Sequence, residues 1–204
     1  MKQYLFFALN LLLALEGTSQ AKGDYMWQIG QNSHPQENPY ALSMVLDFNV
    51  LGINLDTFYR GMKMGYFNAS ISDVDGKLLV YSNGCQIKNG DHSNIPETMS
   101  LSPGETDFEW CLSNPSSGYP KFEGGLFISF FSDSIILLLH QRDYVLSNPT
   151  RIITDSLFYS SVQRDGDQYV LHEKTVPIVG DNLTDGNVEA VKASKPGAWW
   201  VIQG

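Results

Sequence analysis

The residues that most often carry out chemistry in proteins are few in this chain, and their spacing forms no recognisable catalytic motif. Its four histidines are far apart: His34, His92, His140 and His172. His172 precedes Glu173, but the second histidine of a helical zinc motif is missing. No Gly-x-Ser-x-Gly sequence, which presents the nucleophile of many hydrolases, follows the first 21 residues. We therefore predict no catalytic residue and no resident cofactor, and we favour a non-enzymatic function.

Two pairs of closely spaced aspartates lie next to a glycine: Asp73 with Asp75, and Asp165 with Asp167. Aspartate is common in turns because its side chain bonds to backbone N–H groups nearby. We interpret both pairs as turn residues rather than as an acid–base pair.

The densest group of oxygen-bearing side chains contains Asp181 and Asp185, with Asn182 and Asn187 beside them. Carboxylate and carbonyl oxygens are the ligands that Ca²⁺ prefers. Asp181 and Asp185 are therefore the candidate metal ligands, for calcium, and the alternative is a solvated turn.

The N-terminus has the pattern of a secretory signal peptide. Lys2 precedes an apolar run from Tyr4 to Leu15, and a stretch of small and polar residues ends at Ala21. About twelve apolar residues are short for the roughly twenty that cross a bilayer, and no later stretch is longer. We predict a signal peptide over residues 1–21, a mature domain over residues 22–204, no stable membrane span, and a location outside the cell or on its surface.

Export affects how the two cysteines are interpreted, because disulfides persist in oxidising compartments. Cys85 and Cys111 are either a disulfide or two unpaired thiols, since the sequence does not show whether their Cα atoms lie within bridging distance.

The formal net charge of −9, with no run of Lys or Arg, argues against nucleic acid as a partner.

The elements that would position these residues are mainly strands. Asn68 to Gly84 reads as a hairpin, in which Asp75-Gly76 would form a two-residue primed turn between strands at Asn68 to Asp73 and Lys77 to Ser82. Asn54 to Met64 is predicted to be a loop with at most one helical turn. The other predicted strands are Tyr25 to Gly30, Tyr40 to Asn49, Gly125 to Phe131, Ile135 to Gln141, Ser156 to Gln163, Gln168 to Lys174, Gly186 to Ala193 and Ala198 to Gln203.

This series of hairpins predicts an all-β fold of antiparallel meanders. Ser72 to Tyr81 and Val162 to Leu171 share an Asp-Gly step followed by an apolar run. This weak internal sequence repeat suggests propeller blades. Asn89 to Thr106 has no periodicity, and a long connection of this kind is often functional, so we expect it to be the contact loop. Near it, Trp110, Tyr119 and Phe122 are expected to pack over a sheet edge.

Several stretches resemble a family of secreted bacterial propeller or WD40-like proteins associated with type IX secretion. They are N-A-S-I-S-D-x-x-G-x-L-L-x-Y-S-N-G at Asn68 to Gly84, L-F-Y-S-S-V at Leu157 to Val162, K-T-V-P-I at Lys174 to Ile178, A-V-K at Ala190 to Lys192 and W-W-V-I at Trp199 to Ile202. The resemblance implies that the propeller continues past the last strand. We therefore expect an incomplete β-propeller, with about half of the usual 4 to 8 blades and an open strand edge at Ala198 to Gln203.

Two functions are compatible with these observations. The first is an exported, non-catalytic propeller-like module that binds protein or glycan, with the open C-terminal strand edge available for pairing. The alternative is a secreted hydrolase acting on polysaccharide, whose carboxylates come together from separate strands.

Overall fold

A computed structural model describes residues 25–30, 43–58, 61–113, 118–147, 150–183, 188–195 and 197–203. The predicted signal peptide, Asp185 and His34 lie outside these residues, and so does part of the predicted strand at Tyr40 to Asn49. Within the described part of the chain, no helix has the length and apolar character needed to cross a membrane.

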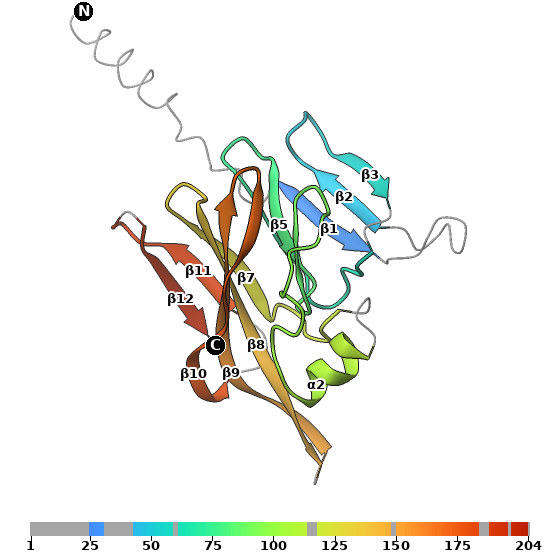
Figure 1. Ribbon diagram of the computed structural model, residues 1–204, viewed down its shortest axis with the longest axis vertical. Coiled ribbons are helices and arrows are strands. Elements are labelled where there is room, and N and C mark those ends of the chain that lie inside the picture. The colour runs from blue at the N-terminus through green and yellow to red at the C-terminus, as the bar shows by residue number, and fades with distance from the viewer. Residues whose placement is uncertain are drawn as a thin grey trace, which may run out of the picture.

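The described residues form an all-β structure of four antiparallel sheets that follow one another along the chain (Figure 1). In each sheet, strands that are neighbours in sequence pair with one another. The first sheet holds β1 (Met26–Gly30), β2 (Ser43–Asp47) and β3 (Asn54–Phe58), and the second holds β4 (Ala69–Ser72), β5 (Leu78–Ser82) and β6 (Ile87–Asn89). The third holds β7 (Gly125–Phe130), β8 (Ile135–Ser147), β9 (Thr150–Asp165) and β10 (Gln168–Leu183), and the fourth holds β11 (Val188–Lys192) and β12 (Trp199–Gln203).

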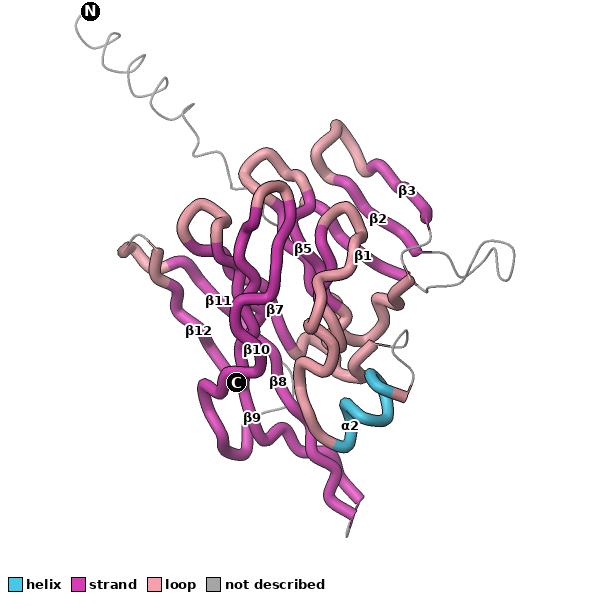
Figure 2. Tube along the Cα trace, viewed as in Figure 1, coloured by secondary structure: helices cyan, strands magenta, loops and turns pink. Residues whose placement is uncertain are grey.

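The first strands of the four sheets lie next to one another. β4 packs between β1 and β7, and β11 packs beside β7, so the remaining strands of each sheet extend away from this line (Figures 1 and 2). Meanders arranged around their first strands are the blades of a β-propeller. The described residues form an open series of four such sheets rather than a closed ring.

Apolar side chains fill each space between consecutive sheets. Met26, Leu78 and Tyr81 join the first sheet to the second. Val80 and Leu138 belong to the larger cluster between the second and third sheets. The third and fourth sheets meet through a further cluster, composed of Ile128, Leu139, Leu157 and Val188 with partly buried neighbours. Because side chains alternate along a strand, one face of β8 contributes to each of the last two clusters.

The hairpin at Asn68 to Gly84 is present, but its predicted two-residue turn is wrong. The Asp73 N–H donates to Lys77 O and the Gly76 N–H donates to Asp73 O, so three residues form the loop. Only Gly76 has a positive φ, of 86°, whereas a primed turn of the predicted type would need a second such residue at Asp75. The Asp73 carboxylate accepts bonds from the Asp75 and Lys77 N–H groups, which favours the wider turn.

Two further predictions are corrected. Asn54–Phe58 is a strand, β3, because β2 pairs with it from Ser43↔Phe58 to Asp47↔Asn54, although its own spacing looks helical. The sequence similarity between Ser72 to Tyr81 and Val162 to Leu171 does not reflect a repeat of equivalent blade positions. The first belongs to the β4–β5 hairpin of the second sheet and the second to the β9–β10 hairpin at the far side of the next sheet.

One side of the segment Asn89 to Thr106, the predicted contact loop, packs against the third sheet. Asn89 Oδ1 accepts a hydrogen bond of 2.8 Å from the Tyr169 N–H, and Leu101 O accepts one of 2.9 Å from the Thr175 hydroxyl. Leu101 itself is fully buried. This segment therefore joins the second and third sheets, and its role as the contact loop stays a prediction.

The connection continues through a short α-helix, α2 (Glu105–Asp107), and one π-helical turn, η1 (Phe108–Leu112). Cys111 in η1 forms a disulfide with Cys85, which follows β5, and their Cα atoms are 5.2 Å apart. The alternative of two free thiols is thereby excluded.

Of the three aromatic residues near this connection, Tyr119 is buried, whereas Trp110 and Phe122 are exposed and contact the ring of Tyr66.

Candidate ligand-binding cleft

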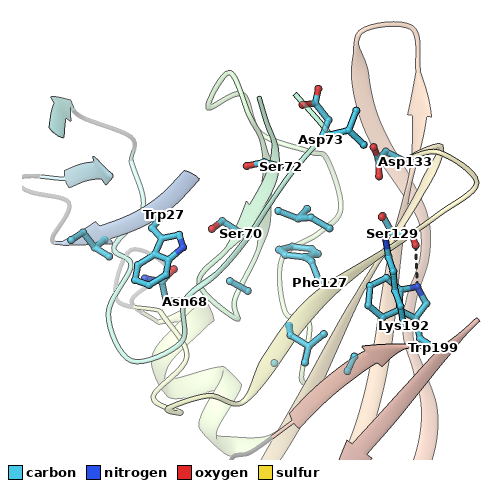
Figure 3. Close-up of a pocket in the computed structure, with 17 residues that line it drawn as sticks. Trp27, Asn68, Ser70, Ser72, Asp73, Phe127, Ser129, Asp133, Lys192 and Trp199 are labelled. Carbon is cyan, nitrogen blue, oxygen red and sulfur yellow. Dashed lines mark hydrogen bonds between the residues drawn. The ribbon is translucent and has the colours of Figure 1, made fainter. Parts of the chain in front are cut away.

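A cleft with a volume of about 850 Å³ opens where the first strands of the four sheets meet (Figure 3). Strands β1, β4, β7 and β11 all contribute to its lining, together with Trp199 at the start of β12 and Asp133 in the β7–β8 turn. This size falls within the range of small-molecule and oligosaccharide sites, which are generally concave and lined by aromatic and a few polar groups.

Trp27 of β1 forms one side of the cleft. Its ring is about half exposed and makes an edge-to-face contact with Phe48, with centroids 5.3 Å apart. Because β1 pairs with β2, Trp27 and Ile29 project from the sheet face opposite to Met26, which is packed against the second sheet. The indole is therefore held in place by its neighbour and still open to a ligand.

Trp199 lies across the cleft from Trp27, together with Lys192 of β11 (Figure 3). The Trp199 indole N–H donates to Ser129 O at 3.2 Å, and the Lys192 Nζ atom lies 5.4 Å from the Trp199 ring centroid. Lys192 and Trp199 face each other in the β11–β12 register. The hydrogen bond and the cation–π contact orient the indole, and the ammonium group adds a positive charge to this wall.

The amide of Asn68 and the hydroxyls of β4, which follows it, line the middle of the cleft. The Asn68 amide donates to Gln28 O and the Ser70 hydroxyl donates to Met26 O at 2.8 Å, which fastens β4 to β1. The Ser72 hydroxyl is buried and has no hydrogen-bond partner among the described residues. A buried hydroxyl without a partner costs free energy, so a ligand that hydrogen-bonds to Ser72 would remove this cost.

Acidic residues lie at one end of the cleft, where Figure 3 shows Asp73 and Asp133. Next to them, Arg164 donates to the Tyr169 hydroxyl at 3.0 Å, and that hydroxyl donates to Asp133 O at 2.7 Å. The hydrogen bond to Tyr169 raises the pKa of Arg164, and the negative charges of Asp133 and Asp73 add to this. The two carboxylates are thus partly balanced by a cation outside the cleft.

Asp181, which the sequence suggested as a metal ligand, does not line the cleft. Asp181 is exposed on β10, and its predicted calcium partner Asp185 is outside the described residues, so calcium binding there stays a prediction. The described histidines are on separate elements, and the described part of the chain contains no cluster of three or more His, Cys, Asp or Glu side chains suited to a metal. Asp165 and Asp167 are exposed at the β9–β10 turn.

His140 is a core residue. It is fully buried on β8, with Nδ1 2.8 Å from the Ser102 hydroxyl and Nε2 3.0 Å from the Ser160 hydroxyl. Its ring stacks on Phe158 at 5.8 Å. Because both nitrogens are engaged and the ring is closed off from solvent, the Ser-His-Ser arrangement is structural.

Sequence reasoning did not predict the cleft, although most of its polar lining lies in stretches with a recognised pattern: Asn68 to Asp73 in N-A-S-I-S-D, Lys192 in A-V-K and Trp199 in W-W-V-I. These patterns indicated strands and a family resemblance, not a shared cavity. Trp27 and Trp199 are at opposite ends of the described chain and meet the same cavity only through the packing of first strands. A usable signal would have been the aromatic or polar residues on the first strand of every predicted meander.

The fold and cleft define a class: an antiparallel β protein of propeller-like meanders with a ligand-sized cleft at their first strands. No family model, curated protein or solved structure matches this chain.

Proposed function

We propose that this protein is an exported, non-catalytic module of the β-propeller type that binds a glycan in the cleft between Trp27 and Trp199. The observation that carries the proposal is the presence of these two indoles on facing walls, with amide, hydroxyl and charged groups between them. The faces of aromatic rings attract the weakly positive C–H groups of sugar rings, and hydroxyl, amide and charged groups hydrogen-bond to sugar hydroxyls.

Export and membership of the type IX-associated family belong to the same proposal. The leader pattern supports export, and the disulfide between Cys85 and Cys111 supports an oxidising compartment. The protein would then act at the cell surface or in the medium, where polysaccharides are available.

The test is binding of defined oligosaccharides, measured by calorimetry with neutral and uronic-acid-containing oligomers. We expect Trp27→Ala and Trp199→Phe each to weaken binding about tenfold, or about 1.4 kcal/mol. Trp110→Ala is the control, because Trp110 lies in η1 and does not line the cleft. Equal affinity in all three variants, or binding to no oligosaccharide, would overturn the proposal.

A polysaccharide hydrolase is the second candidate, favoured by the presence of Asp73 and Asp133 at one end of the cleft. Binding is preferred because Asp73 already accepts two backbone hydrogen bonds in its turn. Recovery of the oligosaccharide intact after long incubation supports binding. Cleavage that is abolished by Asp133→Asn would establish the enzyme.

A protein partner is the third candidate, and it would use the edge of β12. In the described part of the chain β12 pairs with β11 alone, so its other edge can accept an extended peptide by strand addition. A proline in place of Val201 would block such an added strand without altering the cleft lining.

A further inference from the structure

The outer face of the fourth sheet is exposed and mostly apolar, with Glu189 opposite Ile202 as its acidic residue. Val191 and Trp200 are directly opposite each other in the β11–β12 register, and Ile202 lies two residues further along the same face. Trp200 is 69% and Ile202 53% exposed. The other face of this sheet, with Val188, is packed against the third sheet.

The outer face of the first sheet has the same character. Trp27, Leu46 and Leu55 form one cross-strand row over β1, β2 and β3, and Leu55 is 53% exposed. On the opposite face Gln28 and Val45 are buried, and Met26 packs against Leu78 and Tyr81 of the second sheet. The two end sheets of the series therefore each have one packed face and one exposed apolar face.

These exposed faces continue an interface that the chain already makes three times. Consecutive sheets pack face to face through apolar clusters, and each end sheet has an unused face in the direction in which the next sheet would stack. A strand with one face in water normally has polar residues on that face. Apolar rows at both ends thus indicate that both faces are covered in the assembled protein.

We propose that a second copy of this chain covers both faces. The outer face of the fourth sheet of each copy packs on the outer face of the first sheet of the other, so that the two contacts close a ring with a twofold axis. Two copies of four sheets give eight blades, which is within the 4 to 8 of known propellers. Trp27 belongs both to the first-sheet row and to the cleft lining, so the ring is tested at Leu55 and Trp200, which do not line the cleft.

The experiment is the mass of the purified protein in solution, measured by size-exclusion chromatography with light scattering. We expect a dimer with twice the mass of the chain, which is 22.8 kDa for the full sequence. Leu55→Glu and Trp200→Glu should each give monomers, because two identical variant copies would bury a charge in both contacts of the ring. Phe131→Glu, on an exposed turn outside both faces, should remain dimeric.

Mixing the two monomeric variants distinguishes a head-to-tail ring from other dimers. The Leu55→Glu copy keeps an intact fourth sheet and the Trp200→Glu copy keeps an intact first sheet, so one contact survives in the mixed pair. We expect a weak mixed dimer that neither variant forms alone, with melting curves confirming that both variants are folded.

Three results would overturn the proposal. A monomeric wild-type protein would show that no second copy covers these faces. A dimer lost in Trp200→Glu but kept in Leu55→Glu would mean that two fourth sheets pair with each other. A ladder of larger species would mean that the contacts propagate without closing into a ring.

Discussion

The Nζ atom of Lys121 lies 2.5 Å from Asp143 Oδ1, and the two side chains are 1% and 5% exposed. The same ammonium donates to the Thr154 hydroxyl at 2.7 Å, and the Asp143 N–H donates to the Tyr119 hydroxyl at 2.9 Å. Burial raises the pKa of Tyr119 well above its usual value, so this hydroxyl stays protonated. The cluster fastens the long connection between the second and third sheets to β8 and β9.

We expect Lys121→Met to lower the free energy of unfolding by about 3–5 kcal/mol, because it leaves the Asp143 carboxylate buried without its cation. The measurement is urea denaturation at neutral pH. In the double variant with Asp143→Asn, much of this loss should be recovered, since no buried charge remains.

The control for this prediction is Arg142 with Asp155, a partly exposed pair on β8 and β9 whose closest atoms are 2.7 Å apart. Asp155→Asn should cost only about 1 kcal/mol, because solvent screens this pair. If Lys121→Met costs no more than Asp155→Asn, the buried pair does not hold the connection in place.

Stability should fall in mild acid because of His140. Its burial lowers the pKa of His140 from 6.5 to about 3. Below pH 6.5 the unfolded state therefore binds a proton that the folded state does not bind until about pH 3. The free energy of unfolding should decrease through this window by up to about 1.4 kcal/mol per pH unit.

The matched variant is His140→Gln, which is less stable at neutral pH but lacks the titrating ring. Its free energy of unfolding should change less than that of the wild type between about pH 6.5 and pH 5, above the range where most carboxylates titrate. Parallel pH profiles for the two proteins would show that His140 is not the group responsible.

Loss of the disulfide should destabilise the connection. In the chain-entropy model, opening a bridge with a sequence separation of 26 residues costs on the order of 3 kcal/mol. We expect the wild-type denaturation midpoint to fall when a reductant is added. The double variant of Cys85→Ala and Cys111→Ala should have the low midpoint already and show no response to the reductant.

Gly84 combines a positive φ of 79° with a close approach, since a Cβ there would lie 2.6 Å from the Tyr119 Cβ. Gly166 has a φ of 61° and open space around it. Gly166→Ala should therefore cost about 1 kcal/mol from the backbone alone. Gly84→Ala should cost about 3 kcal/mol, because overpacking adds to this term. Equal melting temperatures for the two variants would contradict this account of Gly84.

Much of the secondary structure was predictable from local pattern. The strand before and the strand after Asp75 were placed within a residue or two, because alternation and turn residues act over a few positions. Asn54 to Met64 was predicted to be a loop because Leu55 and Phe58 have helical spacing. That prediction was wrong for Asn54–Phe58, because pairing with β2 makes this segment a strand, β3. The turn type predicted at Asp75-Gly76 was wrong because the Asp73 carboxylate, and not the Asp-Gly step alone, sets the geometry of the turn.

The sequence by itself determined an all-β, antiparallel protein and reduced the disulfide question to one pair of cysteines. Tertiary structure alone decided that Cys85 and Cys111 come within 5.2 Å, that Asn89 to Thr106 is packed, and that Trp27 and Trp199 line one cleft. Strand formation depends on neighbours in sequence, whereas the cleft depends on which face of each sheet packs on the next. That choice is made by apolar contacts between residues far apart in the chain, and no local pattern encodes it.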